Sequence, residues 1–143
     1  MFLLDTNVIS ELRRPERANK NVATWASTIP AGSFFFSVIS IFEIELGTLK
    51  IARRDAAQGA ILRAWIDGQL LPRFEARILA VDIAVAQHSA RLHVPDPRAE
   101  RDAMIAATAI VHGLTVVTRN VAHFKTVGVT LLNPWMARQN GEG

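Results

Sequence analysis

Residues 1–12 read MFLLDTNVISEL, and this stretch indicates the fold class. The apolar run from Met1 to Leu4 predicts a buried strand, because short apolar runs bounded by polar turns are typical of strands. A helix should follow from Thr6 to Arg14 and end before Pro15, since proline disfavours helical backbone in the residue before it. A strand followed at once by a helix is the first unit of an α/β domain.

The same alternation continues along the chain. We expect four more strands, at Ser33–Ser37, Ile78–Val81, Thr115–Thr118 and Val129–Leu132. Helical stretches separate nearly all of them: Asn19–Thr28, Ile39–Ala52, Asp55–Leu71 ending at Pro72, Asp82–His93 and Ala99–His112. Strands joined through helices pair in parallel by default. The sequence therefore predicts an α/β fold with a central, mostly parallel β-sheet of four to five strands flanked by α-helices.

Length and composition suit one compact domain. The chain has 143 residues, half of them apolar, which is enough for one core. We expect a single domain over residues 1–135, with Trp135 a candidate to dock on it, and a loose tail over residues 136–143. The apolar residues of the second long helical stretch should serve mainly as core rather than as a dimer face; they are Ile61, Leu62, Trp65, Ile66, Leu70 and Leu71.

The absence of cysteine excludes disulfides, thiolate zinc sites and cysteine nucleophiles. Neither an export signal nor a run of about 20 apolar residues is visible, so we expect a cytoplasmic protein without membrane contact. The formal net charge is +3 and 13 of the 16 basic residues are arginines. That balance fits a nucleic-acid partner, although charge alone favours simple solubility equally.

Polar residues stand directly after two of the predicted strands. Asp5 follows the first strand, and Thr118, Arg119 and Asn120 lie at the end of the fourth. Ligands of open α/β sheets bind at this carboxyl edge. Asp5 is equally well suited to cap the following helix, and the other three suit an ordinary turn.

Glu43 and Glu45 lie on a helix that is apolar nearly all round. Its apolar stripe comprises Val38, Ile39, Phe42, Leu46 and Leu49. We expect this helix to be largely buried, and a carboxylate in a buried helix must be paired or bind a cation. The periodicity does not choose between Glu43 and Glu45.

Asp102 lies in the first turn of the apolar helix Ala99–His112, where the helix dipole favours an acid whatever its role. Asp96 and Glu100 are alternatives, with Arg98 and Arg101 as possible partners. Together with Asp5 and Glu43, Asp102 would offer the hard oxygen ligands that suit Mg²⁺ or Mn²⁺. His88 and His93 have a poor zinc spacing, and we take His112 and His123 as structural or surface residues.

Three ordered blocks, residues 3–12, 37–47 and 102–124, resemble PIN-domain proteins, specifically VapC-type toxins of the FitB-like branch. The resemblance implies a PIN fold and an Mg²⁺- or Mn²⁺-dependent endoribonuclease acting as the toxin of a type II toxin–antitoxin system. It implies a homodimer and a VapB-type antitoxin partner. It also selects Glu43 over Glu45, makes Asp5, Glu43 and Asp102 the metal-binding acids, and gives Thr6 and Thr118 supporting roles.

The chain departs from the family pattern after the fourth strand. Many PIN domains carry a fourth acid there, whereas Asn120 fills the likeliest position and His123 stands where several relatives have aspartate. We therefore expect one firmly held ion, with any second ion recruited by RNA phosphate. Arg119 is the first choice for positioning the RNA backbone, followed by Arg98 and Arg101. The alternatives are a nuclease acting on DNA and a non-catalytic nucleic-acid-binding or regulatory PIN-like module.

Overall fold

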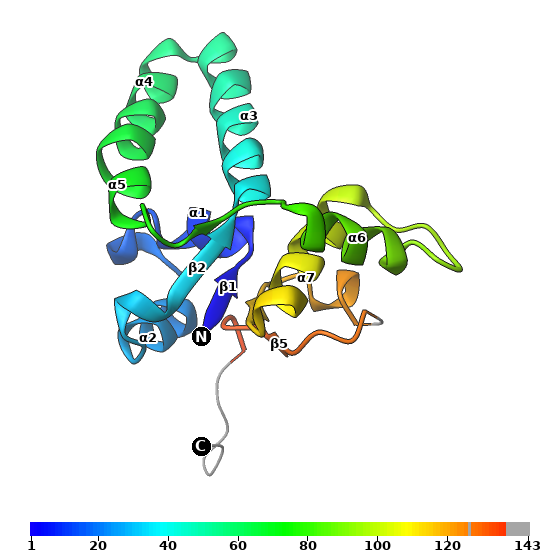
Figure 1. Cartoon of the computed structure of the whole chain (residues 1–143). Helices are drawn as coiled ribbons and strands as arrows, with labels where there is room; N and C mark the ends of the chain where they lie inside the picture. Colours follow the sequence, from blue (N-terminus) through cyan, green and yellow to red (C-terminus); the bar gives the residue numbers. More distant parts are fainter. Residues whose placement is uncertain (126, 137–143) are drawn as a thin grey trace.

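The computed structural model describes residues 1–125 and 127–136. Five strands form one sheet in the order β3-β2-β1-β4-β5, and every neighbouring pair is parallel. The strands are β1 (Phe2–Leu4), β2 (Phe34–Ser37), β3 (Ile78–Leu79), β4 (Thr115–Val117) and β5 (Leu131–Leu132). The predicted α/β fold with a parallel central sheet is confirmed (Figure 1).

Helices lie between most of the strands, close to their predicted bounds. They are α1 (Thr6–Leu12), α2 (Lys20–Ser27), α3 (Val38–Arg54), α4 (Ala56–Trp65), α5 (Leu71–Arg73), α6 (Ile83–Leu92) and α7 (Glu100–His112). Capping residues determine where several helices begin or end. The Asp82 side chain caps the start of α6 by accepting from the Val85 N–H at 3.0 Å. Gly113 ends α7 with a left-handed φ of 67°, a conformation that glycine adopts without steric cost.

Each strand sends alternate side chains into two separate cores. Leu4, Phe36 and Val117 belong to the core under α1, α2 and the end of α4. Leu3 and Val116 point to the opposite face, where α7 covers them with Ile105 and neighbouring alanines. This alternation follows from the two-residue period of a strand, so the sheet is covered on both faces.

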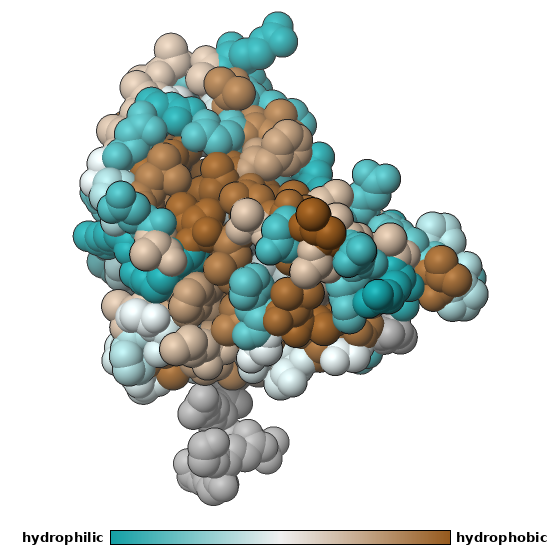
Figure 2. Space-filling model, in the orientation of Figure 1, coloured by the Kyte–Doolittle hydropathy of each residue, from teal (hydrophilic) through white to brown (hydrophobic). Residues whose placement is uncertain are grey.

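The helix α3 is less buried than its composition suggests. It forms a hairpin with α4 that extends away from the sheet (Figure 1). Only Ser40, Ile44 and Thr48 are buried on it, whereas Phe42 and Leu49 of the expected core stripe are 52% and 59% exposed. The prediction of a largely buried helix was therefore wrong. The helix α4 covers one side of α3 and Ile39 packs against the second core, but Val38, Phe42 and Leu49 stay exposed. Figure 2 shows apolar surface over this part of the molecule.

The helical segment that begins with α4 continues past Pro72, where the predicted helix Asp55–Leu71 was expected to end. A π-helical turn, η3 (Ile66–Leu70), links α4 to α5, which includes Pro72 and ends at Arg73. Proline is tolerated there because it occupies the first turn of α5, where a missing N–H matters little. Ile66 and Leu70 are buried as predicted, whereas Ile61 is 55% exposed.

The chain ends beside the first core. Trp135 packs against that core, and its carbonyl oxygen accepts from the Asn21 side chain at 2.8 Å. The expected loose tail lies, apart from Met136, outside the described residues. None of the helices in residues 1–125 and 127–136 is both long and apolar enough to cross a membrane.

Candidate metal centre

The order of the strands brings Asp5 and Thr118 together. β1 and β4 are neighbours in register, so the residues that follow them share one edge of the sheet. The Thr118 hydroxyl donates to Asp5 Oδ2 at 2.8 Å, and the Asn7 side-chain amide donates to the same oxygen at 3.3 Å. Asp5 Oδ1 accepts from the Thr6 N–H at 2.8 Å, which caps α1. Asp5 is only 7% exposed, so these bonds fix its carboxylate.

Glu43 faces the same edge from α3. The Thr6 hydroxyl donates to Glu43 Oε1 at 2.7 Å and lies 3.0 Å from the Ser40 hydroxyl, one turn earlier on α3. Glu45 points elsewhere, forming a bidentate pair with Arg63 of α4. That pairing lowers the pKa of Glu45, chiefly through the hydrogen bond from Arg63. The structure therefore places Glu43, and not Glu45, beside Asp5.

Asp102 completes the acidic cluster, which consists of Asp5, Glu43 and Asp102. Because α7 leads into β4 and runs back against it, the first turn of α7 lies at the carboxyl edge of the sheet. Burial raises the pKa of Asp102, and the charge of Glu43 raises it further. Burial also raises the pKa of Asp5, with smaller contributions from the charges of Asp102 and Glu43. The three carboxylates are therefore within electrostatic reach of one another.

Two basic side chains contact the cluster from its open side. Arg101 Nη1 lies 3.5 Å from Glu43 Oε2, and its guanidinium stacks 4.9 Å from the centre of the Phe42 ring. His123 Nδ1 lies 3.4 Å from Asp102 Oδ2 and lowers the pKa of that carboxyl. Both side chains are about half exposed, at 49% and 58%. Solvent-exposed pairs of this kind contribute little to stability and exchange partners readily.

Two further predicted site residues, Asn120 and Arg119, contact groups next to the acidic cluster. Asn120 donates its backbone N–H to the Thr118 hydroxyl at 3.0 Å. The guanidinium of Arg119 lies 5.3 Å from the centre of the Trp135 ring. The backbone N–H of Arg119 donates to Asn7 Oδ1 at 3.3 Å.

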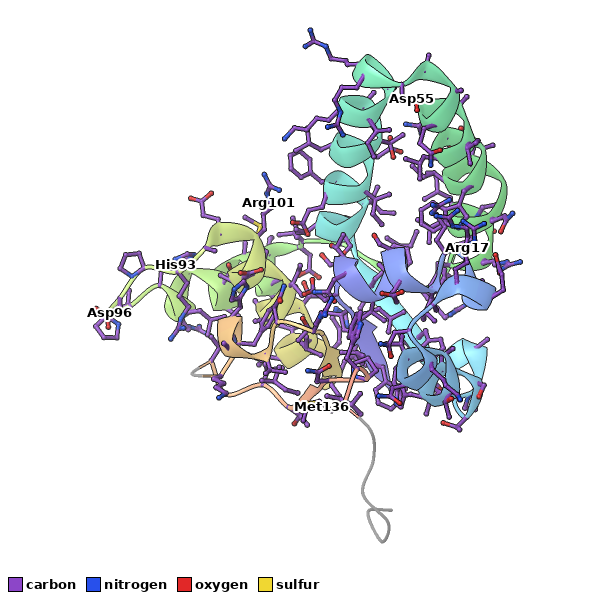
Figure 3. The ribbon with its side chains drawn as sticks, turned by 180° about the vertical axis from the view of Figure 1, so that it is seen from behind. Arg17, Asp55, His93, Asp96, Arg101 and Met136 are labelled. Carbon is purple, nitrogen blue, oxygen red and sulfur yellow. The ribbon has the colours of Figure 1, made fainter. Side chains whose placement is uncertain are left out.

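The two acids that were alternatives to Asp102 lie elsewhere, and so does Arg98. Arg98 binds the Leu92 carbonyl at the end of α6. Figure 3 shows Asp96 at the tip of the loop between α6 and α7, away from Arg101. Glu100 is exposed on the first turn of α7.

Sequence reasoning assigned no role in the site to Asn7, Ser40 or His123. It noted that His123 stands where several relatives have aspartate, but took it as a structural or surface residue. Asn7 carried a signal, because it shares one short motif with Asp5. Ser40 and His123 lie 34 residues from Thr6 and 21 from Asp102, and only the sheet order brings them together.

The donor set fits a hard divalent cation, although the cluster is not drawn tightly together. Its oxygen ligands come from three elements, and the buried Asp5 faces two other carboxylates, an arrangement that a cation would relieve. Within the part of the chain that the structure describes, no three His, Asp or Glu side chains already stand at ion-binding spacing. Binding would therefore require Glu43 to leave Arg101, and Glu43 and Asp102 to move toward Asp5.

Comparison with known proteins gives one consistent relationship. Residues 2–129 match the model of the PIN domain family. The chain is 36% identical to Toxin FitB of Neisseria gonorrhoeae, covering 94% of this chain and 99% of the relative. It is 31% identical to VapC ribonuclease Y4jK of Sinorhizobium fredii, covering 94% and 98%. A crystal structure of FitAcB from Neisseria gonorrhoeae superposes with a TM-score of 0.85 at 35% identity, covering 94% and 99%.

Proposed function

This chain belongs to the PIN-domain family, and we propose that it is the toxin of a type II toxin–antitoxin pair, an endoribonuclease that depends on Mg²⁺ or Mn²⁺. The observation that carries the proposal is the acidic cluster at the carboxyl edge of the sheet, where Asp5 is buried and the charges of Glu43 and Asp102 raise its pKa. The relative named VapC ribonuclease supports RNA as the substrate, and the relative named Toxin FitB supports the biological role.

The protein's own part in the reaction is to hold oxygen ligands in place. Thr118 and Asn7 fix one oxygen of Asp5, and the Thr6 hydroxyl fixes one oxygen of Glu43. Such positioning reduces the reorganisation needed when the ligands engage a cation. A bound Mg²⁺ or Mn²⁺ would supply Lewis-acid polarisation of a phosphate and lower the pKa of an attacking water.

Arginines around the cluster suit the RNA backbone. Arg101 is about half exposed and held to Glu43 only at 3.5 Å, so its guanidinium would be able to bind a phosphate if Glu43 held a cation. Arg119 borders the site through its N–H bond to Asn7. Without the three clustered acids, the chain keeps 16 basic residues against 10 acidic ones. That excess favours binding to a polyanion.

Two protein partners belong to the proposal. A cognate VapB-type antitoxin would bind the chain and block the site, in keeping with the toxin role named for the relative Toxin FitB. A homodimer would cover the exposed apolar stripe of α3, where Val38, Phe42 and Leu49 face outward. Large apolar side chains gathered on one helix face are typical of protein interfaces.

The test compares cleavage of matched RNA and DNA strands with Mg²⁺, with Mn²⁺ and with EDTA. We expect the wild type to cut RNA only with metal, and Asp5→Asn to cut about 100-fold more slowly or worse, because a buried ligand is lost. Asp96→Asn, in an exposed loop, is the matched control and should cut at the wild-type rate. RNA binding without cleavage under any metal would favour the binding module, and preferential cutting of DNA would favour the DNA nuclease.

A further inference from the structure

The imidazole of His123 stands at the open side of the acidic cluster, and we infer that it is a direct ligand of the bound cation. The inference rests on the proposed metal dependence and names a nitrogen ligand beside the three carboxylates. Its consequence is a preference for Mn²⁺ over Mg²⁺, because imidazole suits transition metals whereas Mg²⁺ prefers oxygen.

The spacing of the two side chains fits two ligands of one ion. His123 Nδ1 and Asp102 Oδ2 are 3.4 Å apart. Two donors that each lie about 2.1–2.2 Å from one ion, at a right angle to one another, are separated by about 3.0 Å. The observed distance is longer than that of a normal N–H···O hydrogen bond. A small movement of the two side chains toward each other would bring both atoms to bonding distance from one ion.

The backbone around His123 is held by the same network as Asp5. His123 is the last residue of the short 3₁₀ helix η4 (Val121–His123), and its N–H donates to the Asn120 carbonyl at 3.0 Å. The Asn120 N–H donates to the Thr118 hydroxyl, which in turn donates to Asp5. Immediately after His123, the side chain of Phe124 is 1% exposed and fixes the turn in the second core.

The position of His123 leaves its ring accessible to an incoming ion. The side chain is 58% exposed, and Asp102 is the charged group that it contacts. The other potential nitrogen ligands lie elsewhere: His93 Nδ1 accepts from the Arg98 N–H, and His112 ends α7, opposite the turn that carries Asp102. His88 lies on α6, which packs against α7, so a nitrogen signal identifies His123 when it disappears in His123→Gln.

The experiment is electron spin echo envelope modulation of the full chain loaded with Mn²⁺ in a nitrogen-free buffer. We expect ¹⁴N modulation in the wild type, its loss in His123→Gln, and its retention in the control His112→Gln. Calorimetry should show the Mn²⁺ dissociation constant rising about tenfold or more in His123→Gln, with a much smaller change for Mg²⁺. His123→Asp places an oxygen ligand at this position, so the preference between the two metal ions should move toward Mg²⁺.

The possible failures are distinguishable. Mn²⁺ bound without ¹⁴N modulation, or modulation that survives in His123→Gln, would overturn the role of His123 and leave the carboxylate site standing. A wild-type chain that binds no Mn²⁺ at all would overturn both the inference and the proposed function. Equal losses of Mn²⁺ and Mg²⁺ affinity in His123→Gln would assign His123 only to positioning Asp102 and would also overturn the inference.

Discussion

Asp5 is at once a helix cap and a member of the acidic cluster. One of its oxygens accepts only from the Thr6 N–H and the other accepts from Thr118 and Asn7, so the first oxygen has acceptor capacity left for a cation. Capping and metal binding therefore do not compete for the residue, although sequence reasoning treated them as alternatives. The combination has an energetic cost, because a charged carboxylate is buried beside two others.

That cost should be visible in the pH dependence of stability without metal. The folded pKa of Asp5 is raised above its ordinary value of 3.8, so the folded state holds the proton to higher pH than the unfolded state. The free energy of unfolding consequently falls as pH rises through that window. Asp5→Asn cannot lose a proton, so in EDTA its stability relative to wild type should increase with pH from about 3.8 upward and then level off.

Urea unfolding at a series of pH values, with EDTA present, measures this difference. Asp96→Asn serves as the control, because the exposed Asp96 should show no such trend. The contrary result is a free energy of unfolding of Asp5→Asn, relative to wild type, that stays constant or falls as pH rises. That result would show that the pKa of Asp5 is not raised in the folded state.

The choice between Glu43 and Glu45 shows what residue patterns can and cannot decide. Both acids flank one apolar stripe, and helical periodicity treats them alike. Their partners separate them: Thr6 of α1 meets Glu43, and Arg63 of α4 meets Glu45. Each contact joins residues 18 or more positions apart, so it depends on tertiary packing rather than on local pattern.

At the scale of elements, strands and helices were predictable because their periods and caps are local. The burial of α3 was not, because it depends on where α4 packs. Gly59 sets that packing: a Cβ at residue 59 would lie 2.5 Å from the Cβ of Ala52. The missing side chain lets α4 approach α3 closely, which leaves the other side of α3 exposed.

Gly59→Ala should therefore destabilise the protein by about 1–3 kcal/mol, since overpacking outweighs the better helix propensity of alanine. Gly47→Ala is the matched control in α3, where an added Cβ meets nothing within 4 Å. It should be neutral or stabilise by up to about 1 kcal/mol. Urea unfolding of both variants decides the matter, and equal stabilities would refute the close contact.

For the whole molecule, the sequence composition predicted one domain and fitted a nucleic-acid partner and simple solubility equally well. The oligomeric state could not be predicted from the sequence. An apolar stripe on a helix has the same pattern whether it packs in the core or against a partner chain. The structure turns that stripe outward on α3, with Leu49 59% exposed. We propose that a second copy of the chain covers it.

Light scattering coupled to size exclusion should accordingly report a dimer for the wild type and a monomer for Leu49→Glu, because a buried charge would weaken the interface strongly. Ala60→Glu, at an exposed position of α4, should stay dimeric. A dimeric Leu49→Glu, or a monomeric wild type, would exclude this stripe as the interface.

The central claim is that the acidic cluster, and no neighbouring acid, carries metal-dependent RNA cleavage. The most direct measurement is the rate of RNA cleavage with Mn²⁺ by Glu43→Gln and Glu45→Gln, two equal changes two residues apart on one helix. We expect Glu43→Gln to lose about 100-fold or more and Glu45→Gln, which breaks only the Arg63 pair, to stay within about twofold of wild type. Equal rates for the two variants, or a larger loss in Glu45→Gln, would contradict the claim.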